Sequence, residues 1–282
     1  MFSFSHAGKI GDILYSLYFC CELSAHYKFD QFDYNIQINR RLSEFYEKKP
    51  EEDAFLMTQE SAEFVKPLLD SLPYVRNVSI SEKAEEGSIG LNSFRDGNIS
   101  PVGCEIRDWY YNYSVATLPR AFWKKIIHVT PNPAYRDKIL FTLTDRYVSK
   151  GLNYMALKDF RDHLVFIGTD REYRAFQEKY FELDRAELKS EDSLLTVAQY
   201  MAGAKGYVSN PTGFFALAEL MKINRILFAS DWIGDALDNG RIPFGPKNNM
   251  PLGGWANNVS YHPKLVAAVK ELVEMESRPF PS

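Results

Sequence analysis

The residues best suited to chemistry lie near the start of the chain, where a short apolar segment leads into a turn that contains Gly8 and Gly11. A helix is predicted to open at Asp12. Glycine tolerates positive φ, so both glycines are expected to let the backbone fold sharply. The first turn of a helix has unsatisfied N–H groups and partial positive charge, which favour a carboxylate or a phosphate. Asp12 is therefore a helix cap, a group that faces a ligand crevice, or both.

A second polar turn follows an apolar segment in the other half of the chain. Ser209, Asn210 and Thr212 offer hydrogen-bonding side chains beside a predicted helix start, and Gly213 and Phe214 follow. A glycine here leaves the backbone open to a diphosphate, which the helix start would bind without the lysine of a phosphate loop. An ordinary strand-to-helix turn rich in capping residues has the same composition, so both interpretations stay open.

Two further positions in this half carry charge near strand ends. Arg146 follows the predicted strand 139–143, where its guanidinium would neutralise a leaving diphosphate or lie solvated on a loop. Gly168 ends the next strand, and Thr169 and Glu172 have the spacing of a capping box. Glu172 is thus explained by capping, and a ribose hydroxyl is its alternative partner.

Apolar periodicity arranges the elements that must position these residues. In the first half it predicts strands and helices in alternation, which is typical of a parallel sheet with helices on its faces. The predicted segments are strands 2–5, 34–38 and 75–80 and helices 12–27, 59–71 and 119–127. Residues 81–118 are the least readable and include an aromatic cluster around Trp109.

The alternation restarts after Pro131-Asn132-Pro133, which is the best candidate for a linker. The predicted segments are strands 139–143, 164–168, 206–209 and 225–229 and helices 147–158, 192–203, 214–222 and 263–276, with a long loop over 230–258. We therefore expect an α/β protein with two Rossmann-like doubly wound domains, residues 1–130 and 134–262. Residues 263–282 would form a helix that crosses back to the first domain.

Composition limits the class of protein. The chain has 282 residues, of which 45% are hydrophobic and 25% charged, so it suits two globular domains. A net charge of −4 without a basic cluster argues against nucleic-acid binding. The three cysteines form no disulfide framework, and we expect no secretory signal, no membrane span and a cytoplasmic location.

Several chemistries lack their motifs. The sequence contains no Walker-type phosphate loop, no His-Glu-x-x-His, no Cys-x-x-Cys and no Asp-x-Asp. The turn before Asp12 is not a Gly-x-Gly-x-x-Gly fingerprint, which disfavours a dehydrogenase. We therefore expect no cofactor and no dedicated metal clamp.

The segments Gly11 to Leu17 and Val208 to Ala218 together resemble the heptosyltransferase-like (GT9-type) glycosyltransferases. The segment Leu164 to Tyr173 adds a third similarity, whereas residues 30–130 show hardly any. The chain departs from the family at Asn210, where an acidic residue is common, and in the absence of a histidine after Thr212-Gly213.

The resemblance implies a GT-B architecture, with two domains facing a cleft, and an inverting, metal-independent sugar transfer. A nucleotide-diphosphate sugar would be the donor, and a glycan or other hydroxyl-bearing molecule the acceptor. Asp12 would act as general base, with His6 and Lys9 on the acceptor side. The donor would contact the second domain at the following residues: Arg146, Gly168, Thr169, Glu172, Ser209, Asn210, Thr212, Gly213 and Phe214.

Two other functions fit the same pattern. A nucleotide-sugar epimerase would need more carboxylates and histidines near the sugar than the sequence places there. A non-catalytic nucleotide-binding or assembly protein with a degenerate transferase fold is supported by the departures around Asn210. The predicted enzyme is nevertheless a glycosyltransferase of the hexosyl- or heptosyltransferase type.

Overall fold

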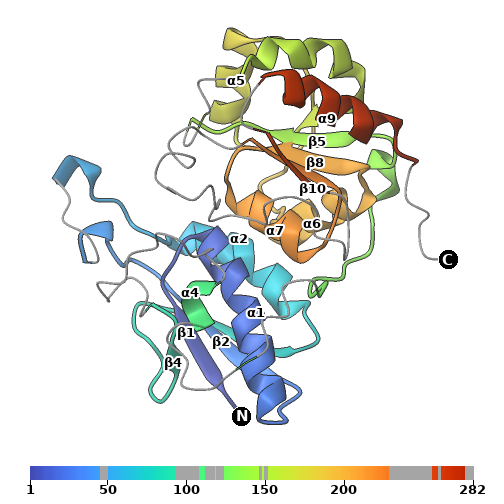
Figure 1. Cartoon of the computed structure of the whole chain (residues 1–282). Coiled ribbons are helices and arrows are strands. Elements are labelled where there is room, and N and C mark those ends of the chain that lie inside the picture. Colours follow the sequence, from blue (N-terminus) through green and yellow to red (C-terminus); the bar gives the residue numbers. More distant parts are fainter. Residues whose placement is uncertain are drawn as a thin grey trace. The chain divides into compact units, whose positions relative to one another are not determined.

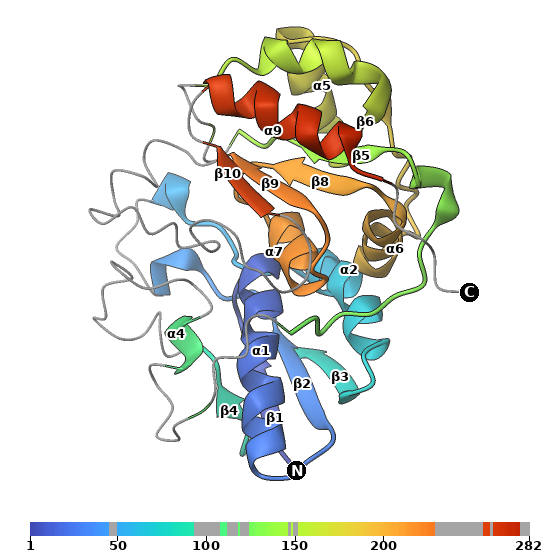
Figure 2. The same ribbon diagram turned by 45° about the vertical axis from the view of Figure 1, so that its right-hand side comes forward.

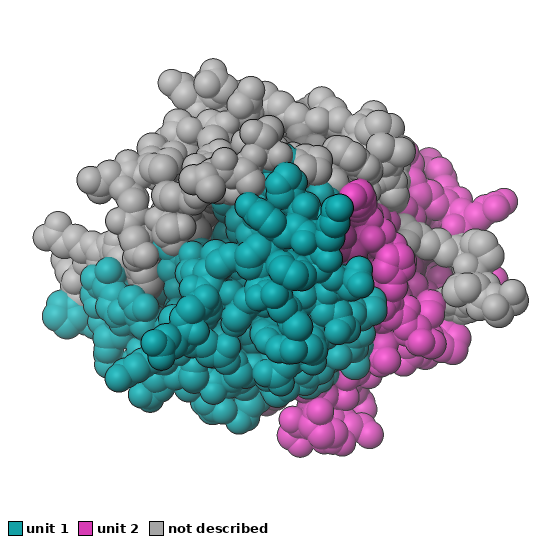
Figure 3. All heavy atoms as spheres, turned by 90° about the horizontal axis from the view of Figure 1, so that it is seen from below, with its two compact units in different colours: residues 1–122, 193–195 teal, residues 123–192, 196–282 magenta. Residues whose placement is uncertain are grey.

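The structure is a computed structural model of the whole chain. It describes residues 1–44, 50–92, 108–111, 118, 124–145, 148, 152–228, 256–259 and 262–276. These residues fall into two compact units, coloured separately in Figure 3. Unit 1 contains residues 1–122 and 193–195, and unit 2 contains residues 123–192 and 196–282. The predicted domain limits, 1–130 and 134–262, stay a prediction.

Unit 1 is built on a parallel sheet with the strand order β3-β2-β1-β4 (Figures 1 and 2). Its elements are β1 (Ser3–His6), α1 (Ile10–His26), β2 (Phe32–Gln37), η1 (Leu42–Glu44), η2 (Pro50–Glu52), α2 (Gln59–Asp70), β3 (Val75–Ser81), β4 (Ile89–Gly90) and α4 (Asp108–Tyr111). Helix α1 packs on the apolar side of the sheet, where Phe19 contacts Phe4 edge-on and Ser16 hydrogen-bonds to Tyr34.

Unit 2 is built on a six-stranded parallel sheet with the order β10-β9-β8-β5-β6-β7. Its elements are η3 (Pro133–Tyr135), β5 (Ile139–Thr142), η4 (Tyr154–His163), β6 (Leu164–Phe166), α5 (Asp170–Lys179), β7 (Asp184–Arg185), α6 (Leu194–Gly203), β8 (Gly206–Ser209), α7 (Gly213–Leu220), β9 (Arg225–Phe228), β10 (Ala256–Val259) and α9 (His262–Glu274). Helices α5 and α9 cover one face, and α6 and α7 lie on the other (Figure 1).

The main core of unit 2 lies under α9. Leu265, Val269 and Leu272 of this helix are buried against Phe141 of β5 and Val208 of β8, in a cluster that also includes side chains from η4 and α5. Strands β5, β8 and β9 are buried at every residue, so the centre of this parallel sheet is covered on both faces. The described part of α9 packs on unit 2. The predicted crossing of the last helix toward the first domain stays a prediction.

The predicted linker is firmly attached to unit 2. The backbone N–H of Asn132 donates to the carbonyl of Gln199 in α6 at 2.9 Å. A Cβ added to Gly203, at the end of the same helix, would meet the Asn132 carbonyl oxygen at 1.8 Å. Closer to the unit boundary, Ile126 donates its N–H to the Leu220 carbonyl at 3.1 Å. This segment is therefore part of the packed unit.

The predicted α/β fold class is confirmed, with two parallel sheets and helices. Three short strands were missed: β4, β7 and β10. The helix predicted over 147–158 is also wrong in its described part, where a 3₁₀ helix, η4, occupies Tyr154–His163 instead. Residues 230–255 of the predicted long loop, and residues 119–123 of a predicted helix, lie outside the described residues.

Candidate functional site

Each unit has a topological switch point, where neighbouring strands lead into connections that run in opposite directions. In unit 1 it lies between β1 and β4, and in unit 2 between β5 and β8. In open α/β sheets, ligands bind outside the carboxyl ends of the strands at this point. The turn before Asp12 follows β1, and the turn at Ser209 to Gly213 follows β8. Both turns singled out in the sequence therefore lie where such folds bind ligands.

Asp12 lies in the first turn of α1, two residues later in the helix than predicted. The helix begins at Ile10 with Lys9 as its N-cap residue, so the predicted start at Asp12 is wrong. Asp12 instead caps backwards, because its Oδ2 accepts the Lys9 backbone N–H at 2.9 Å. Asp12 is 7% exposed. The carboxylate is thus fixed at the edge of the turn by a backbone donor.

Gly8 is required by close packing rather than by positive φ. Among the described glycines only Gly87 has positive φ, so the expectation for Gly8 and Gly11 is wrong. A Cβ at Gly8 would lie 2.5 Å from His6 Cε1 and 2.8 Å from Asp12 Oδ2. The missing side chain is what allows the His6 ring and the Asp12 carboxylate to approach the same stretch of backbone.

His6 and Lys9 differ sharply in exposure. Lys9 is exposed, whereas His6 is fully buried. The Gly8 N–H donates to His6 Nδ1 at 2.8 Å, and His6 Nε2 lies 2.9 Å from the Tyr110 hydroxyl. Tyr110 in turn donates to the Asp12 carbonyl oxygen at 2.7 Å. Lys9 is therefore open to solvent, and both ring nitrogens of His6 have partners inside unit 1.

Two amide side chains close the switch point of unit 1. Asn92, just after β4, accepts the Ala7 N–H through Oδ1 at 2.9 Å. Its Nδ2 donates to Gln37 Oε1 at 3.0 Å. Both amides are buried. They tie the ends of β1, β2 and β4 together beneath the turn that leads to Asp12.

The turn after β8 is held by neutral groups. Thr212 is the N-cap residue of α7, and its Oγ1 accepts the Phe215 N–H at 3.1 Å. The Tyr207 hydroxyl lies 3.4 Å from the same Oγ1, and burial raises the pKa of Tyr207 to about 12. Ser209 is buried on the same side of β8 as Tyr207. Gly213 is the first residue of α7, followed by the partly buried Phe214.

Asn210 connects β8 to the neighbouring strand. Its Oδ1 accepts the Thr144 N–H at 3.0 Å, and its Nδ2 donates to the Thr144 carbonyl at 2.9 Å and hydroxyl at 3.1 Å. The side chain is fully buried. This explains the asparagine in physical terms, because a carboxylate here would have no donor for the Thr144 carbonyl.

The start of α5 is a capping box, as predicted. Thr169 Oγ1 accepts the Glu172 N–H at 3.3 Å, and Glu172 Oε2 accepts the Thr169 N–H at 2.9 Å. A Cβ at Gly168 would lie 3.0 Å from that same carboxylate oxygen. Arg185, which the sequence analysis missed, donates to the Gly168 carbonyl at 3.2 Å and pairs with Asp170. Arg146 lies outside the described residues.

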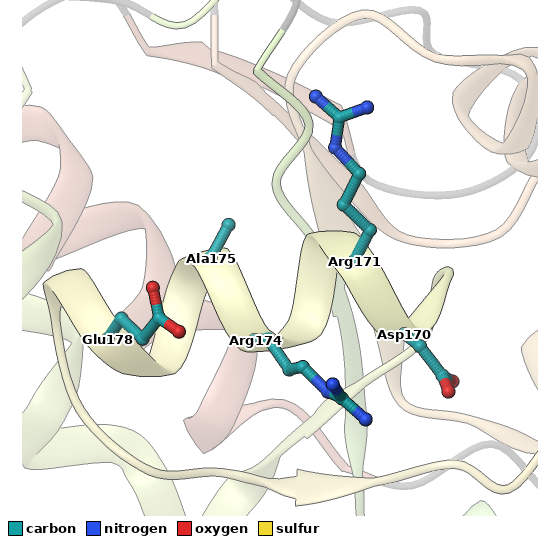
Figure 4. Close-up of a pocket in the computed structure, with 5 residues that line it drawn as sticks. All are labelled: Asp170, Arg171, Arg174, Ala175 and Glu178. Carbon is teal, nitrogen blue, oxygen red and sulfur yellow. The ribbon is translucent and has the colours of Figure 1, made fainter.

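A surface hollow of about 510 Å³ lies along α5. It is lined by Asp170, Arg171, Arg174, Ala175 and Glu178. Figure 4 shows that all five come from one helix and that Arg171 and Arg174 point away from each other. The side chains do not converge on a point, so the hollow is not built like a ligand site.

The helices that begin at the carboxyl ends of the strands differ in the charge of their first turns. Helix α1 has Asp12 in its first turn, and α5 has Asp170 and Glu172. Helix α7 has no acidic residue in its first turn. A carboxylate in the first turn offsets the positive end of the helix dipole, so of these starts that of α7 is the most favourable for an anion.

Sequence reasoning missed Asn92 and Arg185, since neither lies in a motif, and it included Tyr110 only as a member of the aromatic cluster around Trp109. Tyr110 is 98 residues from Asp12, and Asn92 is 85 residues from Ala7. The aromatic cluster was the available signal for Tyr110, and the signal for Asn92 was a polar residue after a short apolar segment. Within the described part of the chain, no cluster of metal-ligating side chains is present, and no helix is long and apolar enough to cross a bilayer.

Searches for related proteins gave matches among solved structures only; no family model and no curated protein matches the chain. A family 9 glycosyltransferase from Veillonella parvula has a TM-score of 0.61 at 10% identity, over 96% of both chains. The Escherichia coli ADP-heptose LPS heptosyltransferase II has a TM-score of 0.60 at 12% identity, over 97% of this chain and 98% of its own.

The Escherichia coli heptosyltransferase WaaC, solved with ADP, has a TM-score of 0.58 at 13% identity, over 97% of this chain and 99% of its own. These similarities extend over both units, including residues 30–130, where the sequence resemblance was weakest. Identity this low establishes the fold. The chain has the fold of the heptosyltransferase-like family 9 glycosyltransferases, as its motifs predicted.

Proposed function

We propose that the protein is a glycosyltransferase that moves a sugar from a nucleotide-diphosphate sugar to a hydroxyl acceptor. One observation carries the proposal: in a chain with this fold, one switch point carries a fixed carboxylate and the other an acid-free helix start. Sugar transfer needs both kinds of site, a base for the acceptor and an anion site for the leaving diphosphate.

The donor diphosphate is proposed to bind at the start of α7. The positive end of the helix dipole favours an anion at a helix start, and α7 has no acidic residue in its first turn to offset it. Ser209 and Asn210 shape this turn, and Arg146 is proposed to add positive charge to it. Since one similar heptosyltransferase was solved with ADP and another is named for ADP-heptose, ADP-heptose is the first donor to test.

The nucleoside is proposed to lie toward β6, next to the diphosphate. Strand β6 adjoins β5, which adjoins β8, and all three are parallel. Gly168 keeps this strand end free of a side chain, and Glu172 presents its carboxylate beside Thr169. A carboxylate there suits a ribose hydroxyl as hydrogen-bond donor.

Asp12 is proposed to remove the proton of the acceptor hydroxyl as it attacks the anomeric carbon. The Lys9 N–H holds the carboxylate in place, so it would need little reorganisation before the transfer. Attack from the side opposite to the leaving diphosphate inverts the anomeric configuration. The two units would face a common cleft in the GT-B arrangement, with Lys9 on the acceptor side and buried His6 supporting the turn.

The test uses the purified chain with ADP-heptose and a deproteinised glycan extract, followed by ³¹P NMR. We expect ADP to form at a rate that depends on the extract, with heptose recovered on a glycan. The anomeric configuration of the product reports inversion. Omission of a divalent cation with added chelator is expected to leave the rate unchanged.

The same experiment separates the rival functions. A nucleotide sugar that is converted to an epimer without any acceptor would make the protein an epimerase. ADP binding without turnover of ADP-heptose or of other nucleotide sugars would support a non-catalytic nucleotide-binding protein. Either result would overturn the transferase proposal.

A further inference from the structure

The Asp12 turn is connected to a residue far along the chain through a hydrogen-bonded path. The path runs from the Gly8 N–H to His6, from His6 to the Tyr110 hydroxyl, and from Tyr110 to the Asp12 carbonyl. Its distances are 2.8, 2.9 and 2.7 Å. His6 and Tyr110 are both buried.

The donors and acceptors of this path fix the state of the imidazole. A backbone N–H can only donate, so His6 Nδ1 must carry a lone pair toward Gly8. The Asp12 carbonyl can only accept, so the Tyr110 hydroxyl hydrogen points to Asp12. Tyr110 oxygen is then left as an acceptor for His6, whose neutral ring must carry its hydrogen on Nε2. The whole path has one consistent direction.

The path holds Asp12 from two sides. On one side, Gly8 lies against both the His6 ring and the Asp12 side chain, where a Cβ would be within 2.8 Å of each. On the other side, the Tyr110 hydroxyl donates to the backbone carbonyl of Asp12, which lies in the first turn of α1. The Tyr110 ring also packs edge-on against the imidazole, with ring centroids 5.6 Å apart.

We propose that His6 and Tyr110 are positioning residues, which set the place of the Asp12 carboxylate without touching the substrate. The inference rests on the proposed role of Asp12 in sugar transfer. It assigns His6 a role different from direct contact with the acceptor. It also gives a function to α4, a short helix in the least readable part of the sequence.

The first test is kinetic and uses the intact chain with ADP-heptose and the glycan extract. Tyr110→Phe keeps the ring and removes the hydroxyl that links His6 to Asp12. Misplacement of a catalytic group by about 1 Å costs on the order of 100-fold, so we expect kcat to fall by about 10- to 100-fold. The donor KM should stay within about twofold, because the donor is proposed to bind unit 2.

Tyr111→Phe is the matched control. Tyr111 is the neighbouring buried tyrosine of the same helix, and its ring packs edge-on against Phe19. Its hydroxyl makes none of the bonds in the path, so we expect kcat to remain near that of the parent. Equal losses of kcat in Tyr110→Phe and Tyr111→Phe would show a general packing effect and overturn the proposal.

Two His6 variants separate the ends of the imidazole. His6→Asn places an oxygen near Nδ1 and keeps the acceptor for Gly8, whereas His6→Gln places an amide nitrogen near Nε2 and keeps the donor for Tyr110. We expect each to retain more kcat than His6→Leu, which removes both. Equal activity of all three variants would contradict a positioning role.

A second test does not depend on activity. In ¹⁵N NMR spectra of the intact protein, the His6 ring should show a protonated Nε2 and an unprotonated Nδ1. Tyr110→Phe should shift the backbone amides of Gly8 to Asp12, and Tyr111→Phe should leave them in place. A proton on Nδ1, or unmoved amides in Tyr110→Phe, would overturn the inference even in a protein that transfers no sugar. Loss of activity toward every donor, with the NMR pattern intact, would instead refute the proposed function.

Discussion

The two switch points are closed in the same way and differ in charge. In unit 1, Asn92 follows the fourth strand and bonds to the turn after the first. In unit 2, Asn210 follows β8, the fourth strand, and bonds to the turn after β5, the first strand. Strands β5 and β8 are neighbours in their sheet, as β1 and β4 are in unit 1. The helix starts beside the two closures come from different strands: α1 follows the first strand of unit 1 and has an acidic residue in its first turn, whereas α7 follows the fourth strand of unit 2 and has none.

This contrast shows how one framework serves two chemical purposes. An asparagine at the switch point joins the strand ends through neutral hydrogen bonds and adds no charge to the site. The charge is then decided by one residue in the first helical turn. Asp12 makes the unit 1 site suitable for a proton acceptor, and Thr212 leaves the positive helix end in unit 2 suitable for a diphosphate.

The largest expected effect comes from neutralising the acidic start. Asp12→Asn keeps an oxygen for the Lys9 N–H, so the turn should keep its shape. Removal of a general base lowers the rate by about 100- to 10,000-fold, and we expect a loss of transfer in that range. ADP binding, measured by calorimetry, should stay within about threefold, since ADP is proposed to bind unit 2. Near-normal turnover would refute the role of Asp12.

The reverse change makes the unit 2 start resemble that of unit 1. Thr212→Asp keeps a good N-cap side chain but adds negative charge where the diphosphate is proposed to bind. We expect the Kd for ADP to rise by at least about tenfold, which is about 1.4 kcal/mol. Thr212→Ser keeps a neutral cap and should bind ADP like the parent. Equal ADP affinity in both variants would place the diphosphate elsewhere.

A stability prediction concerns the close packing at Gly8. Gly8→Ala forces a methyl group into His6 and Asp12, and overpacking of this kind costs about 1–3 kcal/mol. Gly90→Ala is the control, because a Cβ there meets nothing within 4 Å. Urea unfolding should show a lower free energy of unfolding for Gly8→Ala alone. Equal stability of the two variants would mean that the turn relaxes at little cost.

The smallest expected effect is a difference in stability between variants of Asn92 and Asn210, which bond across the two switch points. Asn210→Ala leaves the half-buried Thr144 N–H and carbonyl without this partner, for an expected cost near the lower end of about 1–3 kcal/mol. Asn92→Ala removes a partner of the Ala7 N–H and of Gln37 Oε1, which are both buried, so we expect a loss nearer the upper end of that range. Urea unfolding measures both losses of stability, and the opposite ranking would contradict burial of the released groups as their cause.

Much of the fold was predictable because apolar periodicity is strong where strands and helices pack on a core. Strands β1, β2, β3, β5, β6, β8 and β9 all lie within a few residues of their predicted positions. Strand β7 was missed because Asp184–Arg185 is a short, charged edge strand with no alternation. Strand β4 has only Ile89–Gly90, too short for any period to show.

The site was predictable in its location and less so in its details. Aspartate is a common N-cap, so Asp12 was assigned to that position, whereas it caps backwards from inside the helix. Gly8 suggested a special φ, but its role is contact with His6 and Asp12. Tyr110 was noticed only as part of an aromatic cluster, and its bond to Asp12 could not be predicted because only folding brings the two residues together.

The most direct test of the contrast is a titration of the intact ¹⁵N-labelled protein with ADP, followed by the backbone amides of both helix starts. We expect saturable shifts at Gly213, Phe214 and Phe215, and none of comparable size at Lys9 to Asp12. Saturable shifts confined to the α1 start, or no saturable shift at the α7 start, would contradict this expectation.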